Sequence, residues 1–271
     1  MPIQISTNCT GCGACIKDCP TGNLELSGNR AVTNNGRCLV CAHCVAVCPA
    51  GAVSIDAYDM TEALPCPPES YAVDAAKLLN LMRARRSIRR FAGQPVEQEK
   101  IERIIEAGRY APTASNLQKN RFIIVREQKE QLKKMVLEQL AAEGQRILDT
   151  SQEEFWRVRA KVWIKMHEDY VQNPNSADKL FFNAPEVLVL VSNSDRDGGI
   201  AASYMELLAA AEGLGMLYSG YTSMAANSSD KIKKLLNIAE KEIVVLGMMI
   251  GYPDVRYARI APRHKAQITN L

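Results

Sequence analysis

The chain has 271 residues, 47% of them apolar, and a formal net charge of only +3. This length predicts about two domains, and the near balance of charges excludes a general polyanion binder, so that any basic site must be local. No apolar stretch approaches the roughly 20 residues that span a bilayer, and the first residues do not resemble a signal peptide. We therefore expect a soluble cytoplasmic protein without a membrane or nucleic-acid partner.

Eight of the nine cysteines lie between Cys9 and Cys48, which marks this segment as a separate domain. The motif Cys-x2-Cys-x2-Cys-x3-Cys-Pro occurs twice there, and each cysteine of the second copy follows its counterpart by 29 residues. Such regularity indicates a duplicated unit. Three cysteines spaced by two residues allow one loop to wrap three corners of an iron–sulfur cube, whereas the fourth cysteine, ahead of proline, points elsewhere.

In the bacterial two-cluster pattern, the fourth cysteine completes the other cube. The pattern therefore predicts two [4Fe-4S] clusters, one held by Cys9, Cys12, Cys15 and Cys48 and the other by Cys38, Cys41, Cys44 and Cys19. Zinc and disulfides are the alternatives, but zinc sites usually use two cysteine pairs separated by a longer loop. A disulfide scaffold would need an oxidising compartment, for which the sequence shows no export signal.

Residues 1–60 resemble the bacterial 2[4Fe-4S] ferredoxins. Short apolar segments at residues 3–5, 24–26 and 52–55 predict strands that flank two short helices, each following a ligand loop. We expect a small domain built from a βαβ-type duplication. Since the chain continues for more than 200 residues beyond it, any clusters there are expected to exchange electrons with a second site.

Residues 61–73 are predicted to form a linker, because three prolines lie within the first ten of them. Cys66 lies in this segment and is interpreted as an unpaired thiol, since the predicted cluster ligands are complete without it. The linker divides the chain into a domain at residues 1–60 and a second domain at residues 74–271.

The second domain mixes helices and strands without a strict βαβ rhythm, which favours the α+β class. Asp74 is a predicted helix cap, and Ser151 with Glu154 a predicted capping box. The predicted helices follow Asp74, Pro95 and Ser151 and also cover residues 129–143, 199–213 and 229–236. The predicted strands cover residues 121–125, 187–192 and 243–250, with a loop at residues 213–221 and an extended basic tail.

The stretch RRSIRRF at residues 85–91 places four arginines in seven residues. A nucleic-acid site would be expected to show a broader positive balance or interleaved aromatic residues, and a solvated helix end this dense would repel itself without a nearby anion. Guanidinium groups match phosphate oxygens in a bidentate geometry. Arg85, Arg86, Ser87 and Arg89 therefore predict a phosphate site, although neither a P-loop nor a dinucleotide-binding glycine motif is present.

Three motifs in this order, RRSIRRF, APTASNLQ at residues 111–118 and GLGMLYSGY at residues 213–221, followed by GYP, resemble the FMN-dependent nitroreductase family. The resemblance covers about residues 75–265 and implies an α+β homodimer with FMN at the subunit interface. The resemblance places Arg85, Arg86, Ser87 and Arg89 at the phosphate and the pyrimidine side of FMN, and Arg259 and Arg263 at its phosphate. It places Pro112, Ser115, Asn116 and Gln118 near the isoalloxazine ring, and Tyr218, Ser219 and Gly220 near the flavin N5 atom.

Other positions in the second domain carry weaker expectations. Lys119 and Asn120 stand where the family often has Pro-Trp, and Tyr257 stands where proline is common. Phe91 is expected to pack in the core, and Arg90 is expected to be dispensable for FMN. Residues 143–182 correspond to the variable region of the family, and the aromatic stripe there (Phe155, Trp156 and Trp163) is more often core than a lid over the flavin.

Together the two halves indicate an FMN- and iron–sulfur-dependent oxidoreductase. The clusters would pass electrons to or from FMN, which would reduce a nitroaromatic or quinone-like acceptor, with a ferredoxin-like protein or NAD(P)H as donor. Two alternatives remain, namely a flavin reductase driven by NAD(P)H with the clusters as electron exit, and a non-catalytic electron carrier. No side chain is assigned a catalytic role, and protons are expected to come from solvent.

Overall fold

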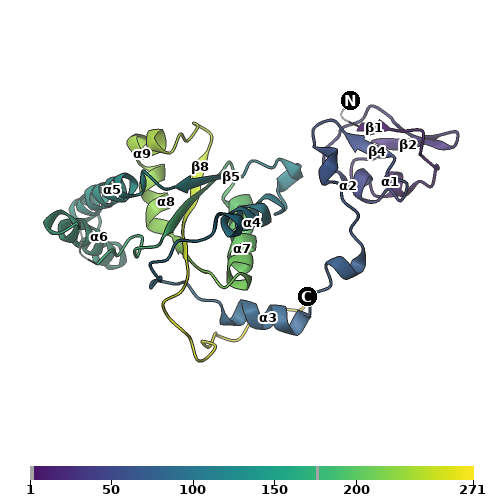
Figure 1. The fold of residues 1–271 in the computed structure, drawn as a ribbon. Helices are drawn as coiled ribbons and strands as arrows, with labels where there is room; N and C mark the ends of the chain where they lie inside the picture. The colour runs from purple at the N-terminus through teal and green to yellow at the C-terminus, as the bar shows by residue number, and fades with distance from the viewer. Residues whose placement is uncertain (1–2, 175–176) are drawn as a thin grey trace. The chain divides into compact units, whose positions relative to one another are not determined.

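The computed structural model describes residues 3–174 and 177–271, and the chain divides into two compact units (Figure 1). The first unit contains Met1–Val73 and also the loop Thr113–Gln118. The second unit contains Asp74–Pro112 and Lys119–Leu271. The loop therefore belongs to the first unit, although the residues on either side of it belong to the second.

The first unit contains two small antiparallel sheets. Strand β1 (Ile3–Ile5) pairs with β4 (Val53–Ile55), and β2 (Leu24–Ser27) pairs with β3 (Arg30–Thr33). The apolar residues of β1, β2 and β4 predict these three strands correctly. Strand β3 is not predicted, because it is four residues long and begins with a charged side chain, so that only its pairing with β2 defines it.

Two one-turn helices, α1 (Ala14–Lys17) and α2 (His43–Ala46), follow the ligand loops as predicted. Each helix carries the third cysteine of its motif, and Cys15 and Cys44 are both buried. They complete the small core of this unit, whose other buried members are Ile3, Leu24, Ala31, Val53 and Ile55. Two short 3-10 turns, η1 (Met60–Glu62) and η2 (Pro68–Ser70), follow, and the exposed Cys66 lies between them.

The second unit is built on a four-stranded antiparallel sheet with the strand order β5-β6-β8-β7. The bounds of these strands are Arg121–Val125 for β5, Glu186–Ser192 for β6, Ile243–Gly251 for β8 and Gly215–Ser219 for β7. The antiparallel pairing and the separate helices agree with the α+β class.

Strand β6 shows why the sheet has a core on both faces. Val187, Val189 and Val191 pack into one buried cluster, and Leu188 and Leu190 pack into the other. Because successive side chains of a strand point to opposite faces, helices must cover both sides. One cluster includes residues of α5 (Lys129–Thr150), α6 (Glu154–Gln172), α8 (Gly220–Asn227) and α9 (Asp230–Leu235), and the other includes residues of α4 (Gln98–Arg109) and α7 (Asp195–Ala211).

Helix α3 (Ala75–Ala84) opens the second unit and buries no side chain. Its predicted cap is confirmed, because the Asp74 carboxylate accepts a hydrogen bond from the Lys77 N–H at 2.9 Å. Leu78, Leu79 and Met82 are all exposed on this helix. The apolar side chains of α3 are therefore not used by the core of the single chain.

Two predictions for the second domain are wrong. Helix α6 begins at Glu154 with Glu153 as its N-cap, whereas Ser151 accepts from the Glu153 N–H at 3.2 Å and serves as the C-cap of α5. The predicted capping box does not form because α5 extends to Thr150 and has Ser151 as its C-cap. The predicted loop at residues 213–221 is instead mostly strand β7, which pairs with β8 and leads directly into α8.

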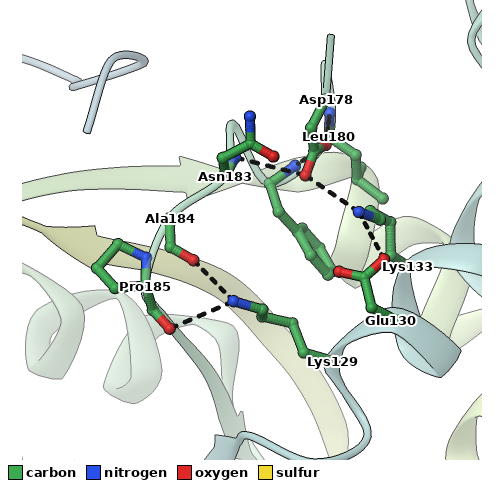
Figure 2. A network of polar contacts seen from close by, with 9 residues as sticks. Lys129, Glu130, Lys133, Asp178, Leu180, Asn183, Ala184 and Pro185 are labelled. Atoms are coloured by element: carbon green, nitrogen blue, oxygen red, sulfur yellow. Dashed lines mark hydrogen bonds and ion pairs between the residues drawn. The ribbon is translucent and has the colours of Figure 1, made fainter. Parts of the chain in front are cut away.

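A polar network holds the turn that enters β6 (Figure 2). The Lys133 ammonium, almost fully buried, lies 2.7 Å from Glu130 and 3.5 Å from Asp178. The Asp178 carboxylate also accepts hydrogen bonds from the backbone N–H groups of Leu180 and Phe181 at 2.9 and 2.8 Å and of Asn183 at 3.4 Å. One buried carboxylate thus joins the turn to helix α5.

Across residues 3–174 and 177–271, the chain forms no helix that is long and apolar enough to cross a bilayer.

Candidate functional site

The cysteines of the first unit gather in two groups that cross between the motif copies. Burial raises the pKa of Cys15, and the thiolates that raise it further are those of Cys48, Cys9 and Cys12. The other four, Cys19, Cys38, Cys41 and Cys44, line one hollow together with Pro20 and Leu39. These neighbours agree with the two predicted sets, each with its fourth member from the other copy, although, after burial, Cys15 of the first set also raises the pKa of Cys44 in the second.

Backbone N–H groups point at four of the sulfur atoms. Cys9 Sγ accepts from Ala31 N at 3.4 Å, Cys19 Sγ from Asn23 N, Cys38 Sγ from Val40 N, and Cys48 Sγ from Ala52 N, the last three at 3.3 Å. The bonds from Ala31 and Gly11 lower the pKa of Cys9, because they favour the thiolate. Such donors are one of the means by which a protein sets the reduction potential of a bound cluster.

The two ligand loops share an unusual backbone. Gly13 and Ala42, which are equivalent in the repeat, both have left-handed φ angles, of 74° and 57°, and both precede the helix that carries the third cysteine. Gly11 and Val40 are also equivalent, with φ angles of 68° and 53°. Within the described chain, no three His, Cys, Asp or Glu side chains converge as ligands of a single metal ion do.

The arginine stretch in the second unit is extended and bonded to neighbouring strands. Ile88 N donates to Met216 O of β7 at 3.0 Å. Further along, Ala92 N donates to Tyr252 O at 2.8 Å. Ile88 is buried and lies against Gly215, so that no side chain larger than hydrogen fits at residue 215. This packing fixes which side chains of the stretch point toward the core and which point away from it.

Arg85 and Arg86 line a hollow of about 230 Å³ that also borders Glu206, Met216 and Tyr257. Arg85 Nη1 forms an ion pair with Glu206 Oε1 at 2.9 Å, which compensates its charge. Arg86 Nη2, in contrast, is buried and finds no hydrogen-bond partner among the described residues. A buried donor without an acceptor is costly, so Arg86 leaves an unused donor and an uncompensated charge at this hollow.

The third motif contributes a partly buried phenol and the start of helix α8. The Tyr218 hydroxyl donates to Ala202 O at 2.6 Å, and burial, followed by the neighbouring Glu206 carboxylate, raises the pKa of Tyr218. Ser219 is the N-cap of α8, because its hydroxyl accepts from Thr222 N at 3.3 Å. A Cβ placed at Gly220 would meet no atom within 4 Å, so α8 faces open space at Gly220, whereas Ser219 and Thr222 beside it are buried.

The second motif lies in the loop that groups with the first unit. Ser115, Asn116 and Gln118 all have left-handed φ angles, between 49° and 55°. Asn116 Nδ2 donates to Val40 O at 2.8 Å, and Gln118 Nε2 donates to the Tyr58 hydroxyl at 2.7 Å. The sequence singles out neither Tyr58 nor Glu206, since each stands outside every motif.

The remaining predicted residues do not join these groups. Ser87, Arg89 and Pro112 are exposed, and Arg259 and Arg263 lie exposed on the extended tail, away from the lining of the hollow beside Arg86. The exposed Arg90 pairs with Asp254 at 3.1 Å. Phe91 packs against the core cluster as expected. Of the aromatic stripe on α6, Trp163 is buried in the core, whereas Phe155 and Trp156 are exposed.

Comparison with known proteins identifies both parts of the chain. Residues 82–252 match the nitroreductase family, and residues 1–59 match a 4Fe-4S dicluster domain. The chain belongs to the nitroreductase family. As a member of this family, the chain is an oxidoreductase. It also carries a ferredoxin-type 4Fe-4S domain on the N-terminal side of the nitroreductase part.

Two curated proteins are similar to about two thirds of this chain. An NADPH-flavin oxidoreductase of Vibrio harveyi is 29% identical over 185 residues, which cover 68% of this chain and 69% of the relative. An iodotyrosine deiodinase of Nematostella vectensis is 22% identical over 187 residues, which cover 66% of this chain and 68% of the relative.

Solved structures of nitroreductases share the fold. An FMN-dependent nitroreductase from Clostridium difficile superposes with a TM-score of 0.53 and 22% identity, over 73% of this chain and 100% of its own. A nitroreductase with bound FMN from Desulfitobacterium hafniense gives a TM-score of 0.51 and 22% identity, over 74% of this chain and 100% of its own. These likenesses show a nitroreductase-like fold for the second unit.

Proposed function

We propose that this chain is a homodimeric oxidoreductase that binds FMN in its nitroreductase part and two [4Fe-4S] clusters in its first unit. It would pass electrons between them and reduce a nitroaromatic or quinone-like acceptor. The observation that carries the proposal is the combination, in one chain, of two crossed sets of four cysteines with the unpartnered guanidinium of Arg86 beside a hollow.

The residues around the hollow fit the phosphate end of FMN. A phosphate oxygen would supply the acceptor that Arg86 Nη2 lacks, and hydrogen bonds to charged groups contribute about 1.5–3 kcal/mol each. Glu206 holds Arg85 in place while it offsets that charge. The volume of about 230 Å³ is below the range of roughly 300–1,000 Å³ typical of small-molecule sites, which fits part of FMN rather than the whole. The matching structure from Desulfitobacterium hafniense contains FMN.

The cysteine groups fit cubic clusters rather than isolated ions. Each group has four thiols, and the N–H groups of Ala31, Asn23, Val40 and Ala52 already point at four of the eight sulfur atoms. Thiolates carry negative charge, and these N–H donors favour the charged form. Both features suit a site that must hold an anionic iron–sulfur group in a small domain.

When bound, the clusters would supply one-electron transfer and FMN would supply both one- and two-electron transfer. The chain's own residues hold and orient these groups. The Tyr218 hydroxyl donates to Ala202 O and keeps its proton, because burial raises its pKa. We therefore assign proton delivery during reduction of the acceptor to solvent rather than to Tyr218.

A homodimer would use the apolar surface of α3. Leu78, Leu79 and Met82 expose 38%, 45% and 41% of their surfaces and lie within five residues of one another. Contiguous apolar side chains of this kind on a soluble protein often mark an interface. Covering them with a second copy would remove this surface from water and give α3 the packing that it lacks in the single chain.

The test begins with anaerobic purification and counts of iron, sulfide and flavin. We expect about eight irons per chain if both clusters are present, together with one FMN. Dithionite should bleach the flavin absorbance, and a nitroaromatic or quinone should restore it. A bound flavin that dithionite bleaches but that neither kind of acceptor reoxidises would contradict the proposed activity.

A second candidate has NADPH reduce FMN directly, with the clusters as the electron exit. It is favoured by the names of two relatives, the NADPH-flavin oxidoreductase of Vibrio harveyi and an NADPH-dependent oxidoreductase of Staphylococcus saprophyticus that is 24% identical over 177 residues. Rapid mixing with NADPH in the absence of any ferredoxin separates the candidates. Prompt loss of flavin absorbance supports direct reduction, and an unchanged flavin supports electron delivery by way of the clusters.

A further inference from the structure

The phenol of Tyr58 lies at the centre of a hydrogen-bond network within the first unit. Its hydroxyl donates to Val40 O and accepts from Asn116 Nδ2 at 3.0 Å and from Gln118 Nε2 at 2.7 Å. Asn116 Nδ2 also donates to Val40 O at 2.8 Å. A phenol can donate once and accept twice, so these contacts use its full capacity, and they tie the loop Thr113–Gln118 to one carbonyl.

That carbonyl belongs to a cluster-binding loop. Val40 stands between Cys38 and Cys41, and its own N–H donates to Cys38 Sγ at 3.3 Å. The same residue thus bonds to a predicted cluster ligand through its N–H and to Tyr58 and Asn116 through its carbonyl. Val40 therefore joins the contacts of Tyr58 and Asn116 to the Cys38 sulfur through a single residue.

The network distinguishes between the two copies of the repeat. The residue equivalent to Val40 in the first copy is Gly11, and the residue equivalent to Tyr58 is Asn29, 29 positions earlier in each case. Gly11 packs directly against the backbone of Asn29, so closely that a Cβ there would lie 2.5 Å from Asn29 O. The loop Thr113–Gln118 bonds to the second copy, at the place where the duplicated sequences have diverged.

The loop itself is held in a costly conformation. Ser115, Asn116 and Gln118 adopt left-handed φ angles without being glycine, and such backbones persist only where their surroundings hold them. The side chains that hold this loop are the amides of Asn116 and Gln118, which donate to Val40 O and to the Tyr58 hydroxyl.

We infer that Tyr58 is a positioning residue that fixes the loop Thr113–Gln118 on the Cys38–Cys41 segment and, through Val40, sets the surroundings of the cluster that Cys19, Cys38, Cys41 and Cys44 would hold. The inference rests on the proposed function.

The first experiment compares Tyr58→Phe with the matched control Tyr71→Phe in the full chain with its iron and flavin restored. Tyr71 is exposed in the linker, and the substitution there removes the same hydroxyl from a side chain outside the network. Hydrogen exchange followed by mass spectrometry should show about fivefold to tenfold faster exchange in residues 113–118 of Tyr58→Phe, as expected for the loss of one or two hydrogen bonds. Tyr71→Phe should match the wild type.

The second experiment records electron paramagnetic resonance spectra of the same proteins after reduction with dithionite. The signal of only one of the two clusters should change in Tyr58→Phe, and the other signal should match the wild type. A Cys41→Ser variant should lose the signal that changes, whereas Cys12→Ser, which removes a ligand of the other set, should keep it.

Each result decides a different part of the inference. Unchanged exchange at residues 113–118 in Tyr58→Phe would overturn the anchoring role. Faster exchange with unaltered spectra of both clusters, or a changed signal that survives Cys41→Ser and is lost in Cys12→Ser, would overturn the link through Val40 to the cluster of Cys19, Cys38, Cys41 and Cys44. A wild-type protein that binds no flavin would defeat the proposed function, and the exchange measurement would still decide the role of Tyr58.

Discussion

Replacing Arg86 with methionine should weaken FMN binding and at the same time stabilise the flavin-free protein. Arg86 Nη2 is buried and without a partner within the described residues, beside a hollow whose other guanidinium, Arg85, is already paired with Glu206. The donor is therefore available to a phosphate, and until one binds it imposes a cost on the fold.

The magnitudes follow from that single donor. One hydrogen bond from a charged group contributes about 1.5–3 kcal/mol, so that losing it should raise the dissociation constant of FMN by about 10- to 150-fold. Leaving a buried donor unsatisfied costs about 1–3 kcal/mol. Methionine, with a similar shape and no donor, should thus raise the free energy of unfolding of the flavin-free protein by about 1 kcal/mol or more.

Two measurements test the weaker FMN binding and the higher stability expected of Arg86→Met. Quenching of FMN fluorescence gives the dissociation constant, and urea unfolding of flavin-free protein gives the stability. Arg90→Ala is the control, because Arg90 forms only an exposed pair with Asp254, worth about 0–1 kcal/mol, and should leave the dissociation constant unchanged. The reasoning is refuted if Arg86→Met binds FMN as tightly as the wild type, or if Arg90→Ala loses the flavin.

Three further predictions concern the buried network and the clusters. Asp178→Ala should lower the free energy of unfolding by about 3–5 kcal/mol, since backbone donors and Lys133 lose their acceptor. Lys133→Met should lower the free energy of unfolding by clearly less, and equal decreases in urea unfolding would contradict this prediction. Burial lowers the pKa of Lys133, but Glu130 and Asp178 outweigh burial and raise the pKa above 10.5. The stability gained from the Lys133 charge is therefore complete below pH 10.5 and is lost as the pH rises through the folded-state pKa. The difference in unfolding free energy between wild type and Lys133→Met should shrink over that pH range, and a constant difference would contradict this prediction. Cys19→Ser should reduce the iron content from about eight to about four per chain, and loss of all iron, or of none, would argue against the crossed ligand sets.

The iron–sulfur part is predictable because its signal is periodic and local. A spacing that repeats at 29 residues fixes which thiols are equivalent, and the ligand chemistry then requires them to meet. The strand β6 is predictable for a similar reason, since a run of Val and Leu bounded by polar residues indicates a buried strand. In both cases the residues that define the feature are neighbours in the sequence.

What the sequence could not reveal depends on contacts between distant segments. The glycines in and beside strand β7 suggest a loop, but Gly215 leaves room for Ile88, which lies more than 120 positions earlier. The Arg85–Glu206 pair and the bonds from Asn116 and Gln118 to Tyr58 likewise join residues far apart. No local sequence pattern predicts such partners, so the roles of Glu206 and Tyr58 can be identified only in the folded chain.

The assignment of the loop Thr113–Gln118 to the first unit changes how the protein can be divided. The chain passes from one unit to the other at residue 74, returns at residue 113 and leaves again at residue 119. Cutting the proline-rich linker would therefore not release an intact first unit, because a fragment of residues 1–73 would lack the partners of Tyr58. Any transplant of the ferredoxin part to another protein would have to carry this distant loop along.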